Sequence, residues 1–201
     1  VNESNFIATA GAVMGEFQRT QVATEIDAYR YSRIAALAKG ASHESAAFTP
    51  SKDNILGKLD EEIAKIQDIV GESEPLVIIM PIPVRTILNN AKDVTRYLDV
   101  ADFKAGEVST KVKTYNEIPI LSVPSDRMKT AYVFADGKTT GQEAGGFKPD
   151  TGAKSINWII MARKAPIAIS KTDKIRVFDP NTNQAADAWK LDYRKFHDIW
   201  I

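Results

Sequence analysis

The chain of 201 residues contains no cysteine. This absence excludes disulfide bonds, thiolate zinc sites and cysteine nucleophiles, and it suits a reducing compartment. Only two histidines are present, His43 and His197, and neither has a second histidine at the spacing of a zinc-binding helix. No G-x-S-x-G motif accompanies them, although the members of a Ser-His-Asp triad can lie far apart in a chain. We therefore expect no metal ligands.

Neither sign of charge is in excess, since Lys plus Arg and Asp plus Glu each total 26. A surface built for tight, non-specific nucleic-acid binding usually shows as a positive surplus, so broad DNA binding is not expected, while a local basic patch is left open. No apolar run approaches the roughly 18 residues of a membrane helix. The longest, PLVIIMPIPV from Pro75, carries three prolines and predicts a buried strand and turn.

The longest periodic pattern in the chain is helical and covers residues 6–39. Apolar residues recur there at a spacing of three to four, with a small change of phase near Gln21. No proline interrupts the run, and Gly40 stands where a helix would end. Such a helix would be about 50 Å long at 1.5 Å per residue, and a rod of that length usually serves as a scaffold.

The remaining pattern changes from helical to strand-like along the chain. A second amphipathic helix is expected from Ile55 to Val70, then an apolar strand from Leu76 to Ile82 and a short helix opened by Pro83. From residue 107 the period is two. The expected strands there are VSTKVKTYN, EIPILSVP, AYVFA, INWIIMAR, PIAISK, KIRVFD and DYRKFHDIWI. This order favours an α+β fold over a doubly wound parallel sheet.

The stretch ADGKTTGQEAGG, residues 135–146, contains a Gly-Lys-Thr and tests for a nucleotide site. A Walker A loop needs a glycine five residues before the Gly-Lys pair and a helix after it. Tyr132 occupies the glycine position, and several glycines and Pro149 follow. A long hairpin connection between AYVFA and INWIIM is the favoured interpretation. A nucleotide-dependent enzyme using Gly137, Lys138 and Thr139 remains the alternative from another class.

Two further patterns are interpreted as structural. DPNTNQ from Asp179 resembles the start of a calcium loop, but Gln184 replaces the required glycine and Lys190 the bidentate glutamate. It predicts a turn capped by Asn181 or Thr182 that leads into a helical NQAADAW. The carboxylates of residues 60–62, and those of Glu25 and Asp27, fit solvated or ion-paired helix faces. We expect no catalytic, cofactor-binding or metal residues, and no enzyme activity.

Several blocks of sequence resemble the major capsid proteins of tailed bacteriophages, in the group common in phages and prophages of Gram-positive bacteria. GEFQRTQVATEIDAYRYSRIAALA is similar to the long spine helix of that family. Three other blocks follow in the family's order and bring the similarity to most of the chain: VPSDRMKTAY, FADGKTTGQEAGG with INWIIMARKAPIA, and KIRVFDPNTNQAADAWKLDYRKFHDIWI. None of them is a catalytic signature, so the specificity lies in their number and order.

The resemblance implies an α+β fold of the Hong Kong 97-like coat type, with a spine helix, a peripheral domain and an axial domain. Residues 1–73 would form the peripheral-type part and residues 74–154 the axial-type part. Residues 155–201 would return as strands that complete the peripheral domain, with a contribution to the axial domain left open. Family members carry an N-terminal arm and an extended β-hairpin ahead of the spine helix. Because the chain begins almost at the spine-like helix, the resemblance implies that it lacks these N-terminal parts, through truncation of the gene, proteolysis of the protein or trimming of the sequence.

The resemblance also implies a function. The chain would be a structural coat protein of the virion capsid, assembled in the cytoplasm of the bacterial host by self-assembly into hexamers and pentamers. Its partners would be copies of itself, a scaffold and a maturation protease, with DNA enclosed but not specifically bound, no membrane and no cofactor. An encapsulin-type nanocompartment shell is the alternative within the same fold. The aromatic residues near the C-terminus could be interface anchors or core: Trp158, Trp189, Tyr193, Phe196 and Trp200.

Overall fold

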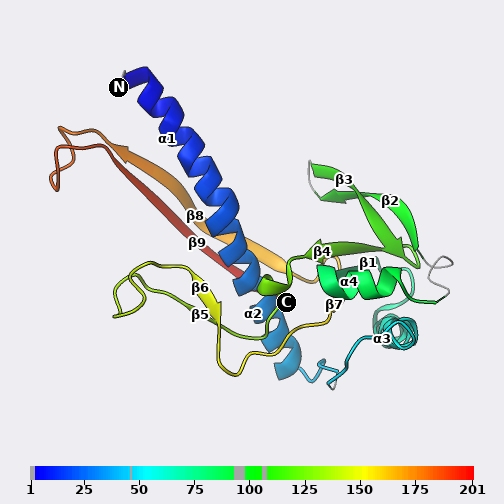
Figure 1. Ribbon diagram of the computed structural model, residues 1–201. Coiled ribbons are helices and arrows are strands. Elements are labelled where there is room, and N and C mark those ends of the chain that lie inside the picture. Colours follow the sequence, from blue (N-terminus) through cyan, green and yellow to red (C-terminus); the bar gives the residue numbers. More distant parts are fainter. Residues whose placement is uncertain (1–2, 46, 93–97, 106–107) are drawn as a thin grey trace.

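One long helical rod dominates the molecule. The computed structural model describes residues 3–45, 47–92, 98–105 and 108–201. The rod comprises α1 (Glu3–Phe17), a π-helical segment η1 (Gln18–Val22) and α2 (Ala23–Gly40). In Figure 1 it runs between the two-stranded ribbon of residues 167–200 on the left and the sheet with its two covering helices on the right. A π turn holds one residue more than an α turn and so rotates the sequence pattern. The expected helix over 6–39 is confirmed, and η1 accounts for the change of phase near Gln21.

A five-stranded sheet forms the body of the molecule, in the order β2-β3-β4-β1-β7. The central strand β1 pairs in parallel with β4 and antiparallel with β7, with Ile78 between Ile120 and Ile160. All six residues of β1 are buried. The bounds are β1 (Leu76–Pro81), β2 (Leu98–Ala105), β3 (Val108–Tyr115), β4 (Ile118–Val123) and β7 (Ile159–Ala162).

Helices cover both faces of β1, which explains why its sequence is apolar without alternation. On one face Ile78 and Met80 lie in a cluster with Leu59 and other residues of α3 (Ile55–Val70) and with Leu88 of α4 (Ile82–Asn89). On the other face Ile79 packs in a second cluster that Tyr31 of α2 adjoins. Strand β1 therefore joins the sheet body to the lower half of the rod.

Local sequence signals set the ends of α3 and α4, as expected. The buried stripe of α3 is spaced by four residues, at Ile55, Leu59 and Ile63. Gly71 ends this helix with φ of 91°, a conformation that costs a glycine little. Pro83 lies in the first turn of α4, where its missing N–H is not needed.

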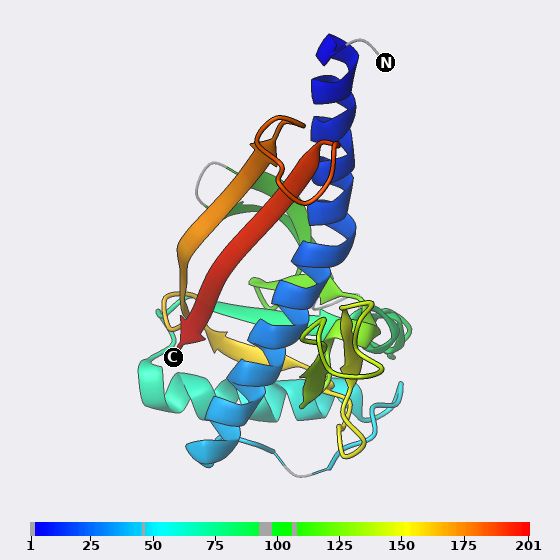
Figure 2. The same cartoon turned by 90° about the vertical axis from the view of Figure 1, so that its left-hand side faces the viewer.

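A long two-stranded ribbon of β8 (Ile167–Phe178) and β9 (Lys190–Trp200) runs back along the rod, as Figures 1 and 2 show. The expected terminal strand is confirmed as β9. The expectation of two separate strands, PIAISK and KIRVFD, is wrong, because they form the single strand β8 with a register shift between Ser170 and Thr172. A β-bulge absorbs the extra residue and lets pairing continue.

Other differences concern short elements. A small hairpin pairs β5 (Tyr132–Phe134) with β6 (Phe147–Pro149), and neither β6 nor β2 was expected from the sequence. The expected helix in NQAADAW is wrong, since residues 180–188 form turns at the tip of the ribbon. The α+β class is confirmed. The domain boundaries at 73/74 and 154/155 stay a prediction, and both α3 and β7 contribute to the core that surrounds β1.

Replacement of Leu59 by alanine should lower the free energy of unfolding by about 2–5 kcal/mol, because it leaves a cavity beneath β1. Leu59 is 0% exposed. Ile69→Ala on the same helix is the matched control, since Ile69 is 79% exposed, and we expect a change within about 0.5 kcal/mol. Urea unfolding followed by circular dichroism measures both. Equal effects of the two substitutions would contradict the packing described.

Candidate assembly surface

The glycine-rich stretch forms the loop of the β5–β6 hairpin. The carboxylate of Asp136 accepts hydrogen bonds from the backbone N–H groups of Lys138 and Thr139, both at 2.8 Å. These two hydrogen bonds lower the pKa of Asp136, and the bond from Thr139 has the larger effect. Strand β6 follows the loop where a phosphate-binding loop would lead into a helix. The amides that a nucleotide would need are thus bound to a carboxylate. The stretch is a hairpin loop, but the expectation that this hairpin joins AYVFA to INWIIM is wrong, because β5 pairs with β6 and the INWIIM strand β7 pairs with β1.

The calcium-like stretch also forms a turn. Asp179 accepts a hydrogen bond from the backbone N–H of Thr182 at 2.9 Å. The turn-forming side chain is therefore that of Asp179, and the expectation that Asn181 or Thr182 caps a following helix is wrong. Among the described residues, no group of three or more His, Asp or Glu side chains could hold a metal ion.

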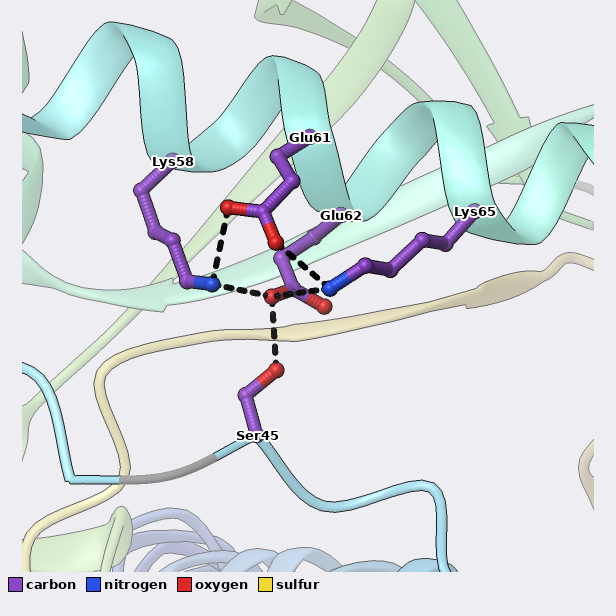
Figure 3. Close-up of polar contacts among 5 residues, drawn as sticks. All are labelled: Ser45, Lys58, Glu61, Glu62 and Lys65. Atoms are coloured by element: carbon purple, nitrogen blue, oxygen red, sulfur yellow. Dashed lines mark hydrogen bonds and ion pairs between the residues drawn. The ribbon is translucent and has the colours of Figure 1, made fainter.

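Glu61 and Glu62 of α3 belong to a network of ion pairs on the side of the helix that faces the loop of Ser45, as Figure 3 shows. Lys58 Nζ lies 2.8 Å from Glu62 Oε1, and Lys65 Nζ lies 2.6 Å from Glu61 Oε1. Ser45, from the loop that follows the rod, donates to Glu62 at 2.6 Å. Neighbouring Asp60 instead accepts a hydrogen bond from the buried Tyr115 hydroxyl at 2.7 Å. The network links the loop to α3. The carboxylates of residues 60–62 are thus ion-paired or hydrogen-bonded, as the sequence predicted for a solvated or ion-paired helix face.

A cavity with a volume of about 520 Å³ lies beside this network, between the end of α2, the loop that follows it and residues 154–160. His43 lines it. Its two most enclosed charges, Lys58 and Glu62, are paired with each other. Phe48 and Trp158 meet edge to face at one side, with ring centroids 5.5 Å apart. Trp158 also packs against the core that surrounds β1, which makes it a core residue.

Tyr29 of α2 contacts the ribbon at its base. Its hydroxyl donates to Asp198 Oδ1 at 2.9 Å, and its ring meets the His197 ring edge to face at 5.2 Å. On the opposite side of the rod, Asp27 pairs with Arg127 at 3.0 Å. Glu25, which the sequence grouped with Asp27, is exposed, although partial desolvation of its carboxylate raises its pKa.

The surroundings of His197 at this junction disfavour its protonated form. Burial lowers the pKa of His197, and the positive charges of Arg30 and Lys195 lower it further, against the opposing effect of Asp198. Within the described chain, Nδ1 of His197 is buried without a hydrogen-bond partner. A proton added to the ring would therefore be unfavourable at the contact with Tyr29, even with Asp198 beside it.

The two faces of the ribbon differ. Tyr193 of β9 lies edge to face with Phe17 of the rod at 6.5 Å, and Ile175, Val177 and Leu191 line an apolar groove of about 390 Å³ against α1. We call this side the inner face. The outer face, which points away from the rod, carries large apolar side chains near the base of the ribbon that are about half exposed: Ile167 (59%), Ile169 (46%), Phe196 (50%) and Trp200 (48%).

The aromatic residues near the C-terminus, for which the sequence left open a role as interface anchors or as core, differ in their exposure. Phe196 and Trp200 are exposed on the outer face. Tyr193 and Trp189 are half-buried, the first against Phe17 and the second at the groove. Exposed apolar groups gathered on one strand pair commonly mark a surface that contacts another protein. The sequence named these residues, but the side on which each lies depends on the register of the ribbon.

Comparison with models of known protein families gave no match. Neither curated proteins nor solved structures gave one either. Among the described helices, none is both long enough and apolar enough to span a membrane.

The stability of the protein should fall as the pH drops from about 7.5 to about 5, because the unfolded histidine, with a pKa of about 6.5, gains a proton that folded His197 resists. His197→Gln should remove part of this slope. The check is the melting temperature across that range. His43→Gln is the control, because it makes the same change away from the junction, and it should retain the pH dependence of the melting temperature. Loss of that dependence in both variants would contradict the role of His197.

Proposed function

We propose that this chain is a structural subunit that works by self-assembly, the major capsid (coat) protein of a tailed bacteriophage or prophage. The observation that carries the proposal is the half-exposed apolar patch on the outer face of the ribbon, at Ile167, Ile169, Phe196 and Trp200. A monomer gains nothing from leaving such groups in water, whereas a subunit of a shell buries them against its neighbours.

The arrangement of the elements supports the proposal. The Hong Kong 97-like coat fold pairs a spine helix with a β-sheet in its peripheral domain and holds an axial domain beside them. Here the rod Glu3–Gly40 has the ribbon of β8 and β9 along it, and the sheet body lies to one side (Figure 1). The proposal predicts this order and placement of elements, and the sequence block that resembles the spine helix, GEFQRTQVATEIDAYRYSRIAALA, lies within the rod.

Ribbon geometry adds a second reason. An isolated two-stranded ribbon is marginally stable in water, and three or more strands are usually needed. The ribbon pairs only β8 with β9 among the described strands, so each has an edge with unpaired backbone groups. Exposed edges of this kind are templates for pairing with another chain. Contact with neighbouring copies would cover both the edge and the apolar patch.

Electron microscopy of the complete gene product that contains this chain should show closed shells or rings of capsomers. The double variant Ile167→Asp/Trp200→Ser should abolish them, because it places a charge in the apolar patch and removes its largest side chain. Val100→Asp is the matched control, since Val100 is similarly exposed (59%) but lies on β2 of the sheet body. A persistent monomer in the unchanged protein would refute the proposal.

Titration with ATP or GTP and magnesium should give no saturable binding, because Asp136 already occupies the amides of Lys138 and Thr139. Isothermal calorimetry measures this directly. Saturable binding that is lost in Lys138→Ala would instead support the nucleotide-dependent alternative and overturn our interpretation of the hairpin.

A further inference from the structure

The far half of the ribbon's outer face is basic. Beyond the bulge, residues of β8 pair across the ribbon with residues of β9, and directly paired residues lie on the same face. The pairs on the outer face are Thr172 with Phe196, Lys174 with Arg194, Arg176 with Asp192 and Phe178 with Lys190. This half-face therefore carries four cations and one carboxylate, in a chain whose formal net charge is zero.

Most of these cations have no carboxylate partner. Arg176 forms an ion pair with Asp192. In the described part of the chain, no ion pair includes Lys174, Lys190 or Arg194, and all three are exposed. The guanidinium carbon of Arg194 lies 4.9 Å from the ring centroid of Phe196, and Lys190 Nζ lies 5.7 Å from that of Phe178. The result is a surface of cations over aromatic rings, which we call the basic face.

A surface of opposite character lies on the sheet body. Asp68 lies in the last turn of α3, and Glu72 and Glu74 follow the end of the helix. None of the three takes part in an ion pair with a described residue, and Ile69 (79% exposed) and Val70 (44%) lie among them. We call residues 68–74 the acidic end.

The acidic end is unfavourable as it stands in the monomer. The C-terminus of a helix carries the negative end of its macrodipole, so carboxylates there are repelled and cations are favoured. The last turn of α3 has no basic residue. An external cation at this position would therefore remove two unfavourable effects at once, the repulsion among carboxylates and their repulsion by the helix end.

We propose that the basic face of one copy docks on the acidic end of the next copy. The charges complement each other, three unpaired cations against three unpaired carboxylates, and each surface also offers exposed apolar groups to bury. The two surfaces lie on different parts of the molecule, the far half of the ribbon and the end of α3 in the sheet body (Figures 1 and 2). One molecule presents both halves of the contact.

Such a contact joins two different surfaces and is therefore head to tail. Head-to-tail contacts close into rings when the rotation between copies allows it, and otherwise form open chains. This inference rests on the proposed function in that its partner is another copy of the chain, and it adds which surfaces meet. Exposed ion pairs contribute little affinity singly, so the charges chiefly set orientation and rate of encounter, while the apolar groups supply burial.

The test reverses the charge on each surface of the 201-residue chain. Sedimentation velocity then measures self-association at concentrations up to about 1 mM, which is high enough to populate even a weak complex. One variant is Lys174→Glu/Arg194→Glu and the other is Asp68→Lys/Glu72→Lys. Each alone should weaken self-association about tenfold or more at low salt, and an equimolar mixture of the two should associate again, because reversed surfaces complement each other. The unchanged chain should associate less at high salt.

Lys138→Glu/Lys148→Glu on the β5–β6 hairpin changes the net charge by the same amount as the ribbon variant and should leave association unchanged. All variants should keep their circular dichroism spectra, since every altered residue is exposed. No association of the unchanged chain at any concentration tested would overturn the proposal, as would a mixture that fails to restore it. A ribbon variant that associates normally but loses binding to a DNA duplex would assign the basic face to nucleic acid instead.

The outcomes also separate this inference from the proposed function. Closed shells formed by the complete gene product carrying the ribbon variant would refute the contact while leaving the coat function standing. Absence of shells in the unchanged gene product would refute the coat function itself, whatever the sedimentation result for the chain.

Discussion

The burial of strand β1 on both faces is the constraint on which the rest of the structure depends. Side chains alternate along a strand, so Ile78 and Ile79 point to opposite sides, and each needs an apolar cover. Helices α3 and α4 cover one side, and the lower half of the rod, with the turn at Met128, covers the other. This requirement fixes the rod to the sheet body, and Asp27 with Arg127 adds an ion pair at the same junction.

Because only the lower half of the rod is fixed in this way, its upper half projects from the body. The ribbon is its neighbour there, with Phe17 against Tyr193 and an apolar groove between them. Even so, Val13 is 60% exposed and Phe17 is 44% exposed. The chain thus combines a well-buried body with a poorly covered extension. A division of this kind is expected of a subunit whose neighbours complete the burial.

The sequence predicted the elements whose own periodicity is strong. The rod, α3, β1 and the terminal strand each follow from a local repeat of three to four or of two, and Gly71 and Pro83 mark helix ends by backbone chemistry. It missed β2, whose residues become a strand only through full pairing with β3. The sequence also predicted a helix in NQAADAW, because alanine has a high helix propensity. The chain instead turns back there between the paired strands β8 and β9. Such errors arise because partners distant in sequence decide the outcome.

The two-sided character of the ribbon shows most clearly why the candidate surface could not be predicted from the sequence. Ile167, Ile169, Ile175 and Val177 all have odd numbers, so a regular strand would place them on one face. The extra residue at the bulge, Lys171, reverses the alternation halfway along β8. Apolar groups therefore face outward at the base and toward the rod beyond it, where the cations turn outward instead. The net charge of zero conceals this separation, because the balancing carboxylates lie elsewhere, some of them at the end of α3.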